Sequence, residues 1–201
     1  MTGSGKTTFV NRYLLNSEPA CRFLYDDLNR MWPRLKLSPC YAPAHLEASL
    51  ATRWSAFVPA RILGHFKGDP KLAFRWWCRW VFAAASRGPG KKMVVIPEVW
   101  RHCNEDSIPM ELATLLQAGR ELGIECIVDT QRPERLNGSI TGAVTELVVF
   151  RQMGREAIRA TEAMLYDAGL SPDRAALAAL PLGSFVGFNR LSGGSLTGSV
   201  F

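Results

Sequence analysis

Residues 3–8, Gly-Ser-Gly-Lys-Thr-Thr, are followed at once by an amphipathic stretch that predicts a helix over Lys6 to Asn16. They match the second half of the phosphate-loop pattern Gly-x-x-x-x-Gly-Lys-[Ser/Thr]. Glycines let successive backbone N–H groups point at phosphate oxygens, and the amino terminus of the helix adds its dipole. Lys6 is expected to reach the β- and γ-phosphates, and the Thr7 hydroxyl to bind Mg²⁺. The predicted nucleotide-binding residues are Thr2, Gly3, Ser4, Gly5, Lys6, Thr7 and Thr8.

The first half of that pattern does not lie within these residues. Its first glycine would fall one position before Met1, and no apolar strand leads into the loop. In folds of this kind that strand is central to the sheet. We therefore expect residues 1–201 to be a single phosphate-loop domain without its first strand and first loop glycine, and the natural reading frame to extend upstream.

Composition excludes several other classes of protein. The chain has 201 residues, and 24 Lys and Arg against 18 Asp and Glu give a net charge of +6, which is compatible with a polyanionic partner but indicates one only weakly. The 47% hydrophobic content is that of a globular domain, and no apolar run approaches the roughly 18 residues of a membrane helix. With no signal peptide and five scattered cysteines, we expect a cytoplasmic protein with reduced thiols and no membrane span of its own.

Helical and apolar stretches alternate along the chain, which predicts an α/β fold. A largely parallel sheet with helices on both faces is expected, followed by a C-terminal β-hairpin. The predicted strands are 21–26, 93–96, 124–130, 146–150, 184–189 and 196–200, and the predicted helices are 6–16, 45–53, 70–86, 109–122, 134–142, 154–168 and 173–179. Asp69 and Ser107 are the expected N-caps of the helices over 70–86 and 109–122.

A carboxylate follows the buried strand Met93 to Ile96. Nucleotide hydrolysis needs an acidic group at such a strand end, to hold Mg²⁺ or to orient the attacking water. Glu98 fits the position that activates water. Pro97 stands where an Asp would hold the metal, so Mg²⁺ is left with Thr7, phosphates and waters.

Two other side-chain groups have structural interpretations. The helical spacing of Trp76, Trp77, Trp80 and Val81 favours a core or subunit contact over a base-stacking platform. His102 and Cys103 are neighbours, but adjacent residues seldom face each other, so a loop pair is favoured over a nucleophile and its base.

Gln131 ends a third strand, in the stretch Ile-Glu-Cys-Ile-Val-Asp-Thr-Gln-Arg-Pro (124–133). A glutamine there can hydrogen-bond both a γ-phosphate and the attacking water. The stretch from Gly119 to Arg151, with its Thr-Gln-Arg-Pro and an apolar strand that ends in Phe-Arg, resembles the FtsK/HerA superfamily of DNA-pumping ATPases. With the half phosphate loop and the acidic strand, the resemblance covers most of the chain, and its small size is similar to the genome-packaging branch of viruses and mobile elements.

The resemblance implies a RecA-like core that binds ATP and Mg²⁺ and forms a homo-oligomeric, usually hexameric, ring. The ring would pump double-stranded DNA, and a viral capsid or membrane vertex is a further docking partner. By position, Glu98 would be the catalytic carboxylate and Gln131 the sensor. Arg120, Arg151 and Arg155 are candidates for an arginine finger that reaches a neighbouring subunit's γ-phosphate. Arg101, Arg132 and Arg135 are candidates to contact DNA phosphates without reading sequence.

Two other functions are compatible with a phosphate loop. A small-molecule kinase would need an acceptor site and an arginine-rich lid, and the Thr-Gln-Arg-Pro strand speaks against it. An assembly or export ATPase of the filamentous-phage type usually carries a membrane helix, which this sequence lacks. A fragment without its central strand that is inactive or does not fold is a third possibility.

Overall fold

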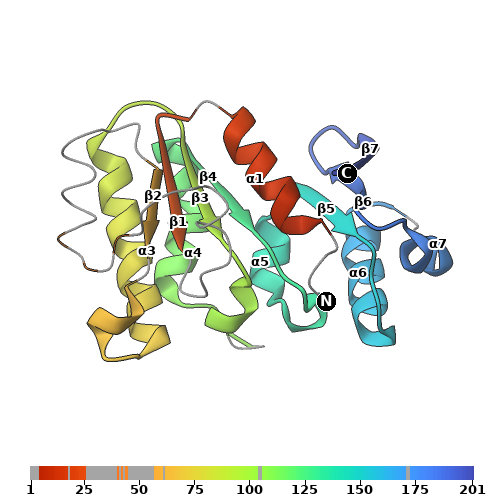
Figure 1. Cartoon of the computed structure of the whole chain (residues 1–201), viewed down its shortest axis with the longest axis horizontal. Helices are drawn as coiled ribbons and strands as arrows, with labels where there is room; N and C mark the ends of the chain where they lie inside the picture. Colours follow the sequence, from red (N-terminus) through yellow and green to blue (C-terminus); the bar gives the residue numbers. More distant parts are fainter. Residues whose placement is uncertain are drawn as a thin grey trace.

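The computed structural model describes residues 5–17, 19–25, 40, 42, 44, 57–60, 62–103, 106–170 and 173–201. Thr2, Gly3 and Ser4 of the predicted phosphate loop, and the predicted helix over 45–53, therefore lie outside the described residues. Within them the α/β class is confirmed (Figure 1). The strands are β1 (Cys21–Tyr25), β2 (Phe57–Ala60), β3 (Lys92–Ile96), β4 (Ile124–Val128), β5 (Glu146–Phe150), β6 (Ser184–Asn189) and β7 (Ser195–Ser199). The α-helices are α1 (Lys6–Asn16), α3 (Pro70–Arg87), α4 (Met110–Gln117), α5 (Gly138–Ala143), α6 (Arg155–Asp167) and α7 (Arg174–Ala179).

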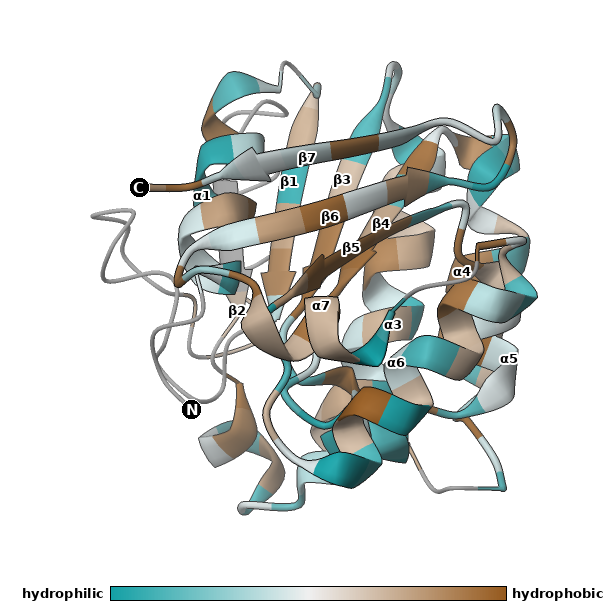
Figure 2. Ribbon diagram, turned by 90° about the vertical axis from the view of Figure 1, so that its right-hand side faces the viewer, coloured by the Kyte–Doolittle hydropathy of each residue, from teal (hydrophilic) through white to brown (hydrophobic). Residues whose placement is uncertain are grey.

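The strands form two separate sheets. The first is parallel and four-stranded, in the order β2-β1-β3-β4, and the second is three-stranded, in the order β5-β6-β7. Both pairings in the second sheet are antiparallel, so the predicted hairpin is present and β5 pairs with its first strand. In Figure 2 hydrophobic residues are concentrated on β3, β4 and β5, as expected for strands that lie inside the molecule.

Side-chain alternation assigns the two faces of the parallel sheet to different helices. Phe23 and Tyr25 of β1 and Val94 and Ile96 of β3 pack with α3 and α4. The other side chains of these strands point to the opposite face of the sheet. They are Leu24, Met93 and Val95, and they pack against Val10 and Leu14 of α1. Because successive residues of a strand point to opposite faces, this pattern places α1 on one side of the sheet and α3 with α4 on the other.

Helix α1 also contacts the antiparallel sheet. The Phe9 ring packs edge-on against Phe150 of β5 and Phe185 of β6, with centroid distances of 5.9 and 5.0 Å. The helix therefore bridges the two sheets, and in Figure 1 it lies over the junction between β4 and β5. Helices α6 and α7 pack against the opposite side chains of β5 through Val149, Leu165 and Leu177.

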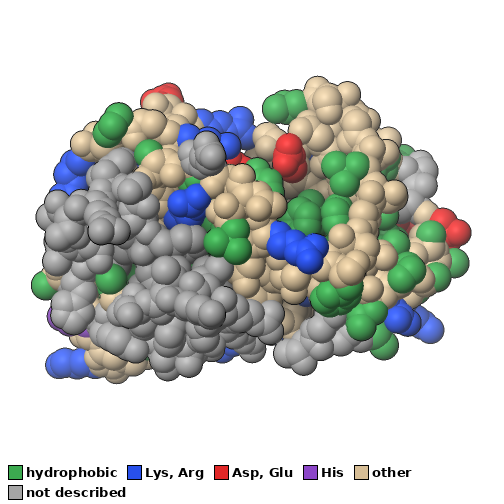
Figure 3. All heavy atoms as spheres, turned by 45° about the horizontal axis from the view of Figure 1, so that its top comes forward, with side chains coloured by type: hydrophobic (Ala, Val, Ile, Leu, Met, Phe, Trp, Pro, Cys, Tyr) green, Lys and Arg blue, Asp and Glu red, His purple; other side chains and the backbone are tan. Residues whose placement is uncertain are grey.

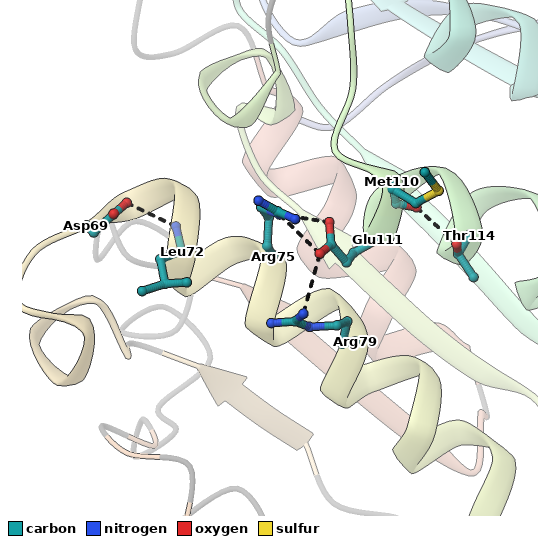
Figure 4. Close-up of polar contacts among 7 residues, drawn as sticks. All are labelled: Asp69, Leu72, Arg75, Arg79, Met110, Glu111 and Thr114. Atoms are coloured by element: carbon teal, nitrogen blue, oxygen red, sulfur yellow. Dashed lines mark hydrogen bonds and ion pairs between the residues drawn. The ribbon is translucent and has the colours of Figure 1, made fainter.

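Helix α3 forms as its sequence predicts. Asp69 accepts hydrogen bonds from the backbone N–H groups of Lys71 and Leu72, and Pro70 occupies the first turn (Figure 4). Trp77, Trp80 and Val81 are buried, which confirms the core interpretation of the tryptophan stripe. No helix among the described residues has the length and apolar character needed to cross a membrane.

Two predicted helices differ from the observed ones. The helix expected over 109–122 ends at Gln117 and continues as a 3₁₀ turn, η3 (Gly119–Leu122). Its N-cap is Pro109, and the cap makes no side-chain hydrogen bond, so the prediction of Ser107 was wrong. The helix expected over 134–142 is divided into a 3₁₀ turn, η4 (Pro133–Arg135), and α5, because Asn137 interrupts it and caps the N–H of Ser139.

Candidate functional site

The phosphate-loop glycine lies where another residue would not fit. Gly5 has a φ of 99°, which favours glycine, and a Cβ added to it would lie 2.6 Å from Val200 Cγ2 and 3.2 Å from Phe150 Cε1. Lys6 begins α1 directly after it, and no side chain caps the first turn of this helix. The first N–H groups of a helix have no partner within it, so this terminus is suited to bind an anion.

Lys6, Thr7 and Thr8 occupy the first turn of α1 and are partly buried. Burial lowers the pKa of Lys6, and the nearby carboxylates of Asp129 and Glu98 oppose that effect. The lysine at the start of α1 therefore shares its surroundings with acidic groups that follow β4 and β3. Lys6 and Glu98, two of the predicted site residues, thus lie near each other.

Glu98 is the centre of a hydrogen-bonded cluster at the carboxyl ends of β3 and β4. It is only 5% exposed and adopts φ 50°, a left-handed conformation that costs a non-glycine residue free energy. Its N–H donates to Asp129 Oδ1 at 3.0 Å, and its Oε2 accepts from the N–H of Gln131 at 3.1 Å. The structure thus brings the two predicted residues, Glu98 and Gln131, into direct contact.

Trp100 completes this cluster and was not predicted to belong to it. Its indole Nε1–H donates to Glu98 Oε2 at 2.7 Å. Asp129 is part of the strand motif 124–133, and its place at the end of a parallel strand is the sequence signal for its position beside Glu98. For Trp100 the sequence carries no comparable signal, because the bond depends on the turn η2 (Val99–His102), which folds the indole back toward Glu98.

The three arginines predicted to contact DNA converge on that same tryptophan. Their guanidinium carbons lie 5.9 Å (Arg101), 5.2 Å (Arg132) and 5.2 Å (Arg135) from the centroid of the Trp100 ring. All three side chains are exposed, and none forms an ion pair with another described residue. Two loops that are separate in the sequence therefore build one basic surface patch around an indole.

The arginine-finger candidates are dispersed and exposed. Arg120 lies in η3, before β4, so the length of that strand separates it from Asp129 and Gln131; it donates to the carbonyl of Ala143 at 3.4 Å. Arg151 follows β5 and donates to the carbonyl of Ala178 at 3.2 Å. Arg155 is the first residue of α6. The structure does not gather these three side chains at the Lys6–Glu98 cluster.

A cavity of 590 Å³ extends between β4 and β5. Residues of both strands line it, together with Lys6, Phe9, Val10 and Tyr13 of α1. Hydrophobic side chains, bordered by basic and acidic ones, gather near the middle of the face in Figure 3. β4 pairs with β3 and β5 pairs with β6, and no described strand pairs with the edge that either presents to the cavity.

The His102–Cys103 pair has a structural role, as predicted. The His102 ring stacks on Phe74 at a centroid distance of 4.1 Å and meets Tyr25 edge-on. Burial, with a contribution from Arg101, lowers its pKa to about 4, and burial raises the pKa of Cys103 to about 11. A neutral imidazole and a protonated thiol do not form a nucleophilic pair. All five cysteines are free, and no metal-binding group of His, Cys, Asp and Glu occurs in the described part of the chain.

Parallel strands, an open helix terminus after a glycine turn, and a carboxylate cluster at the strand ends define the fold class of P-loop NTPases. The genome packaging NTPase B204 of Sulfolobus turreted icosahedral virus 2, in complex with ATP-gammaS, aligns with a TM-score of 0.73 at 14% identity. The alignment covers 98% of this chain and 92% of B204. The DNA-packaging ATPase B204 of Sulfolobus turreted icosahedral virus gives a TM-score of 0.71 at 15% identity, over 96% and 91% of the two chains.

A bacterial conjugative coupling protein, TrwBdeltaN70, is also similar, with a TM-score of 0.53 at 14% identity over 71% of this chain and 39% of its own. No protein-family model and no curated protein sequence matches the chain. These structures agree, at the level of the fold, with the resemblance carried by the motifs between Gly119 and Arg151.

Proposed function

We propose that this protein is an ATPase that moves double-stranded DNA, in the manner of a genome-packaging motor. The observation that carries the proposal is the Glu98–Gln131 contact beside Lys6 at the carboxyl ends of β3 and β4. In that arrangement Lys6 and the amino terminus of α1 bind the phosphates of ATP, Glu98 orients the attacking water, and Gln131 senses the γ-phosphate. The fold shared with B204, named as a DNA-packaging ATPase, supports the choice of DNA.

Mg²⁺ fits the donors at this site. The Thr7 hydroxyl and the carboxylate of Asp129 are oxygen donors near Lys6, and Mg²⁺ prefers oxygen ligands and retains waters. The ion would neutralise charge that develops on the phosphates. Asp129 could thereby supply the acidic group that Pro97 does not.

Assembly and location are further parts of the proposal. Exposed Arg120, Arg151 and Arg155 could reach the γ-phosphate of a neighbouring subunit in a hexameric ring, which would complete each site from outside. The five free cysteines favour the host cytoplasm, where thiols stay reduced. A viral capsid or membrane vertex would then be the docking partner of the ring.

We also infer that an extended strand leading into Gly5 fills the cavity between β4 and β5 and completes the domain. Among the described strands none pairs with the facing edges of β4 and β5, and the backbone N–H and C=O groups of such edges are suited to pair with a further strand. Gly5 lies beside Phe150 at the end of β5, and Lys6 lies near Asp129 at the end of β4. A strand that enters Gly5 would therefore run parallel to β4.

An added N-terminal segment tests this inference. The sequence Thr-Val-Ile-Val-Val-Gly, fused before Met1, should slow amide hydrogen exchange in β4 and β5 by about tenfold or more, because new ladder bonds close both edges. The control is the same extension with two prolines in place of central valines, since proline cannot donate to the ladder. Equal exchange in the two fusions would contradict the inference.

Turnover measurements test the ATPase. The protein should hydrolyse ATP faster when duplex DNA is present, and Lys6→Ala should lower kcat/KM by about a hundredfold or more. Arg12→Ala, on the same helix and outside the cluster, is the matched control. Unchanged turnover in Lys6→Ala would refute the nucleotide site, whereas turnover without any DNA effect but with phosphoryl transfer to a metabolite would favour a kinase.

A further inference from the structure

We infer that Trp100 is a positioning residue that couples DNA binding at the Arg101–Arg132–Arg135 patch to the orientation of the Glu98 carboxylate. The inference rests on the proposed function and adds a route between its two sites. Trp100 contacts both: its N–H donates to Glu98, and its ring faces the three guanidinium groups.

The first step is the hydrogen bonding of the Glu98 carboxylate. Its Oε2 accepts two hydrogen bonds, from Trp100 at 2.7 Å and from the backbone of Gln131 at 3.1 Å. A carboxylate oxygen offers two lone pairs, so these donors engage Oε2 fully. A short bond to an ionised acceptor is among the stronger hydrogen bonds in proteins. Trp100 thus holds the carboxylate in one orientation.

The second step is the state of the arginines. Three exposed cations lie within 6 Å of one ring centroid and form no ion pair with another described residue. A cation–π contact at an exposed site is weak, and the three like charges repel one another. A polyanion relieves that repulsion. Phosphates that bind these arginines would draw the guanidinium groups from the ring.

The third step is how the movement is transmitted. The two loops that carry the patch are joined by backbone bonds: Val99 N–H donates to the carbonyl of Asp129 at 3.0 Å, and Asp129 N–H donates to that of Ile96 at 3.2 Å. This short ladder keeps the loops in register. The indole is the side chain that spans from the patch to the carboxylate, so displaced arginines change the Trp100–Glu98 bond before they change the strands.

Removal of the N–H alone tests the coupling. Trp100→Phe keeps an aromatic face for the arginines but cannot donate to Glu98. We expect its kcat without DNA to rise about three- to tenfold, its stimulation by DNA to fall toward onefold, and its DNA affinity to stay within about twofold of the natural protein. A purely structural role would lower both turnover rates and leave their ratio unchanged.

Two other variants complete the experiment. Trp76→Phe removes an indole N–H from α3, away from the cluster, and should leave basal turnover and stimulation unchanged. Arg132→Ala with Arg135→Ala should weaken duplex DNA binding and reduce its salt dependence by about one unit of slope per arginine.

The outcomes separate this inference from the proposed function. Unchanged basal kcat and unchanged stimulation in Trp100→Phe would overturn the coupling while the DNA-translocating function stands. If DNA stimulates not even the natural protein, the proposed function fails, and with it the DNA arm of the coupling. A raised basal kcat in Trp100→Phe would then still establish that Trp100 restrains Glu98.

Discussion

The parallel and antiparallel sheets differ in how they are covered and in what they carry. Every residue of β3 is buried, with helices on both faces of its sheet, whereas most of β7 is exposed. The loops after β3 and β4 hold Glu98, Asp129 and Gln131, while Phe150 of β5 and Val200, which follows β7, pack against Gly5. The first sheet therefore carries the residues of the proposed catalytic site, and the second packs against the glycine that precedes α1.

The parallel sheet should be the more sensitive to loss of a contact with α1. Leu14 is fully buried against Leu24, Met93 and Val95, so Leu14→Ala is expected to lower the free energy of unfolding by about 2–5 kcal/mol. Leu15, next to it and 67% exposed, is the control, and its alanine variant should change stability by less than about 0.5 kcal/mol. Equal effects in denaturant titrations would show that α1 does not dock on this sheet as described.

Acid should lower the free energy of unfolding through His102, which packs against Tyr25 of the parallel sheet. Its pKa is lowered to about 4 when folded, below the ordinary value of 6.5, so the unfolded chain binds the proton more readily between these values. The neutral His102 makes its full contribution to the free energy of unfolding above pH 6.5. This contribution is lost as the pH falls toward 4, by up to about 3 kcal/mol. His102→Phe should lose less stability than the natural protein over that range.

The exposed His65 provides the control for that titration. His65→Gln should follow the pH dependence of the natural protein. If the stability of His102→Phe also follows the pH dependence of the natural protein, then the imidazole of His102 is not held neutral by its packing against Phe74 and Tyr25.

Substitution of Gly5 should strain the contact between the phosphate loop and the antiparallel sheet. An alanine there combines a left-handed φ with a clash against Val200, at a cost of about 1–3 kcal/mol in unfolding free energy. Gly142→Ala is the control, because a Cβ there meets nothing within 4 Å and alanine favours the helix. A Gly5→Ala protein as stable as the control would mean that Gly5 does not pack against Phe150 and Val200.

The smallest effect on stability is expected for an ion pair between α3 and α4, on the surface beside the parallel sheet. Arg75 donates to both carboxylate oxygens of Glu111 at 3.1 and 3.0 Å, and Arg79 lies 3.7 Å from Glu111 Oε1 (Figure 4). These bonds hold the pKa of Glu111 below its usual value, but both arginines are exposed. Arg75→Ala should lower the melting temperature slightly in low salt and not measurably in high salt. A large loss that persists in salt would contradict this.

Much of the parallel sheet could be predicted from the sequence. A strand buried on both faces is a continuous apolar run, so the predicted strand Met93 to Ile96 differs from β3 by a single residue. Helix α3 was predicted because Asp69 and Pro70 are local signals of a helix start. Strand ends also indicated Glu98 and Gln131, since parallel strands bring their carboxyl ends to one edge.

What depended on tertiary contacts was not predicted. Neither the Trp100–Glu98 bond nor the convergence of Arg101, Arg132 and Arg135 follows from spacing, because two loops meet only after β3 and β4 pair. The predicted end of the helix over 109–122 was wrong, because Ala118 and Gly119 begin a tighter turn that packs Gly119 against Ile124. Periodicity alone does not show that change.

The most direct test of the account is movement along DNA. A third strand bound as a triplex at one end of a linear duplex is displaced when a motor travels through it, and its release can be followed by fluorescence. The protein is predicted to release the third strand in the presence of ATP and Mg²⁺. Lys6→Ala and Glu98→Gln should not do so. Release without ATP, or ATP turnover that never displaces the strand, would contradict the central claim.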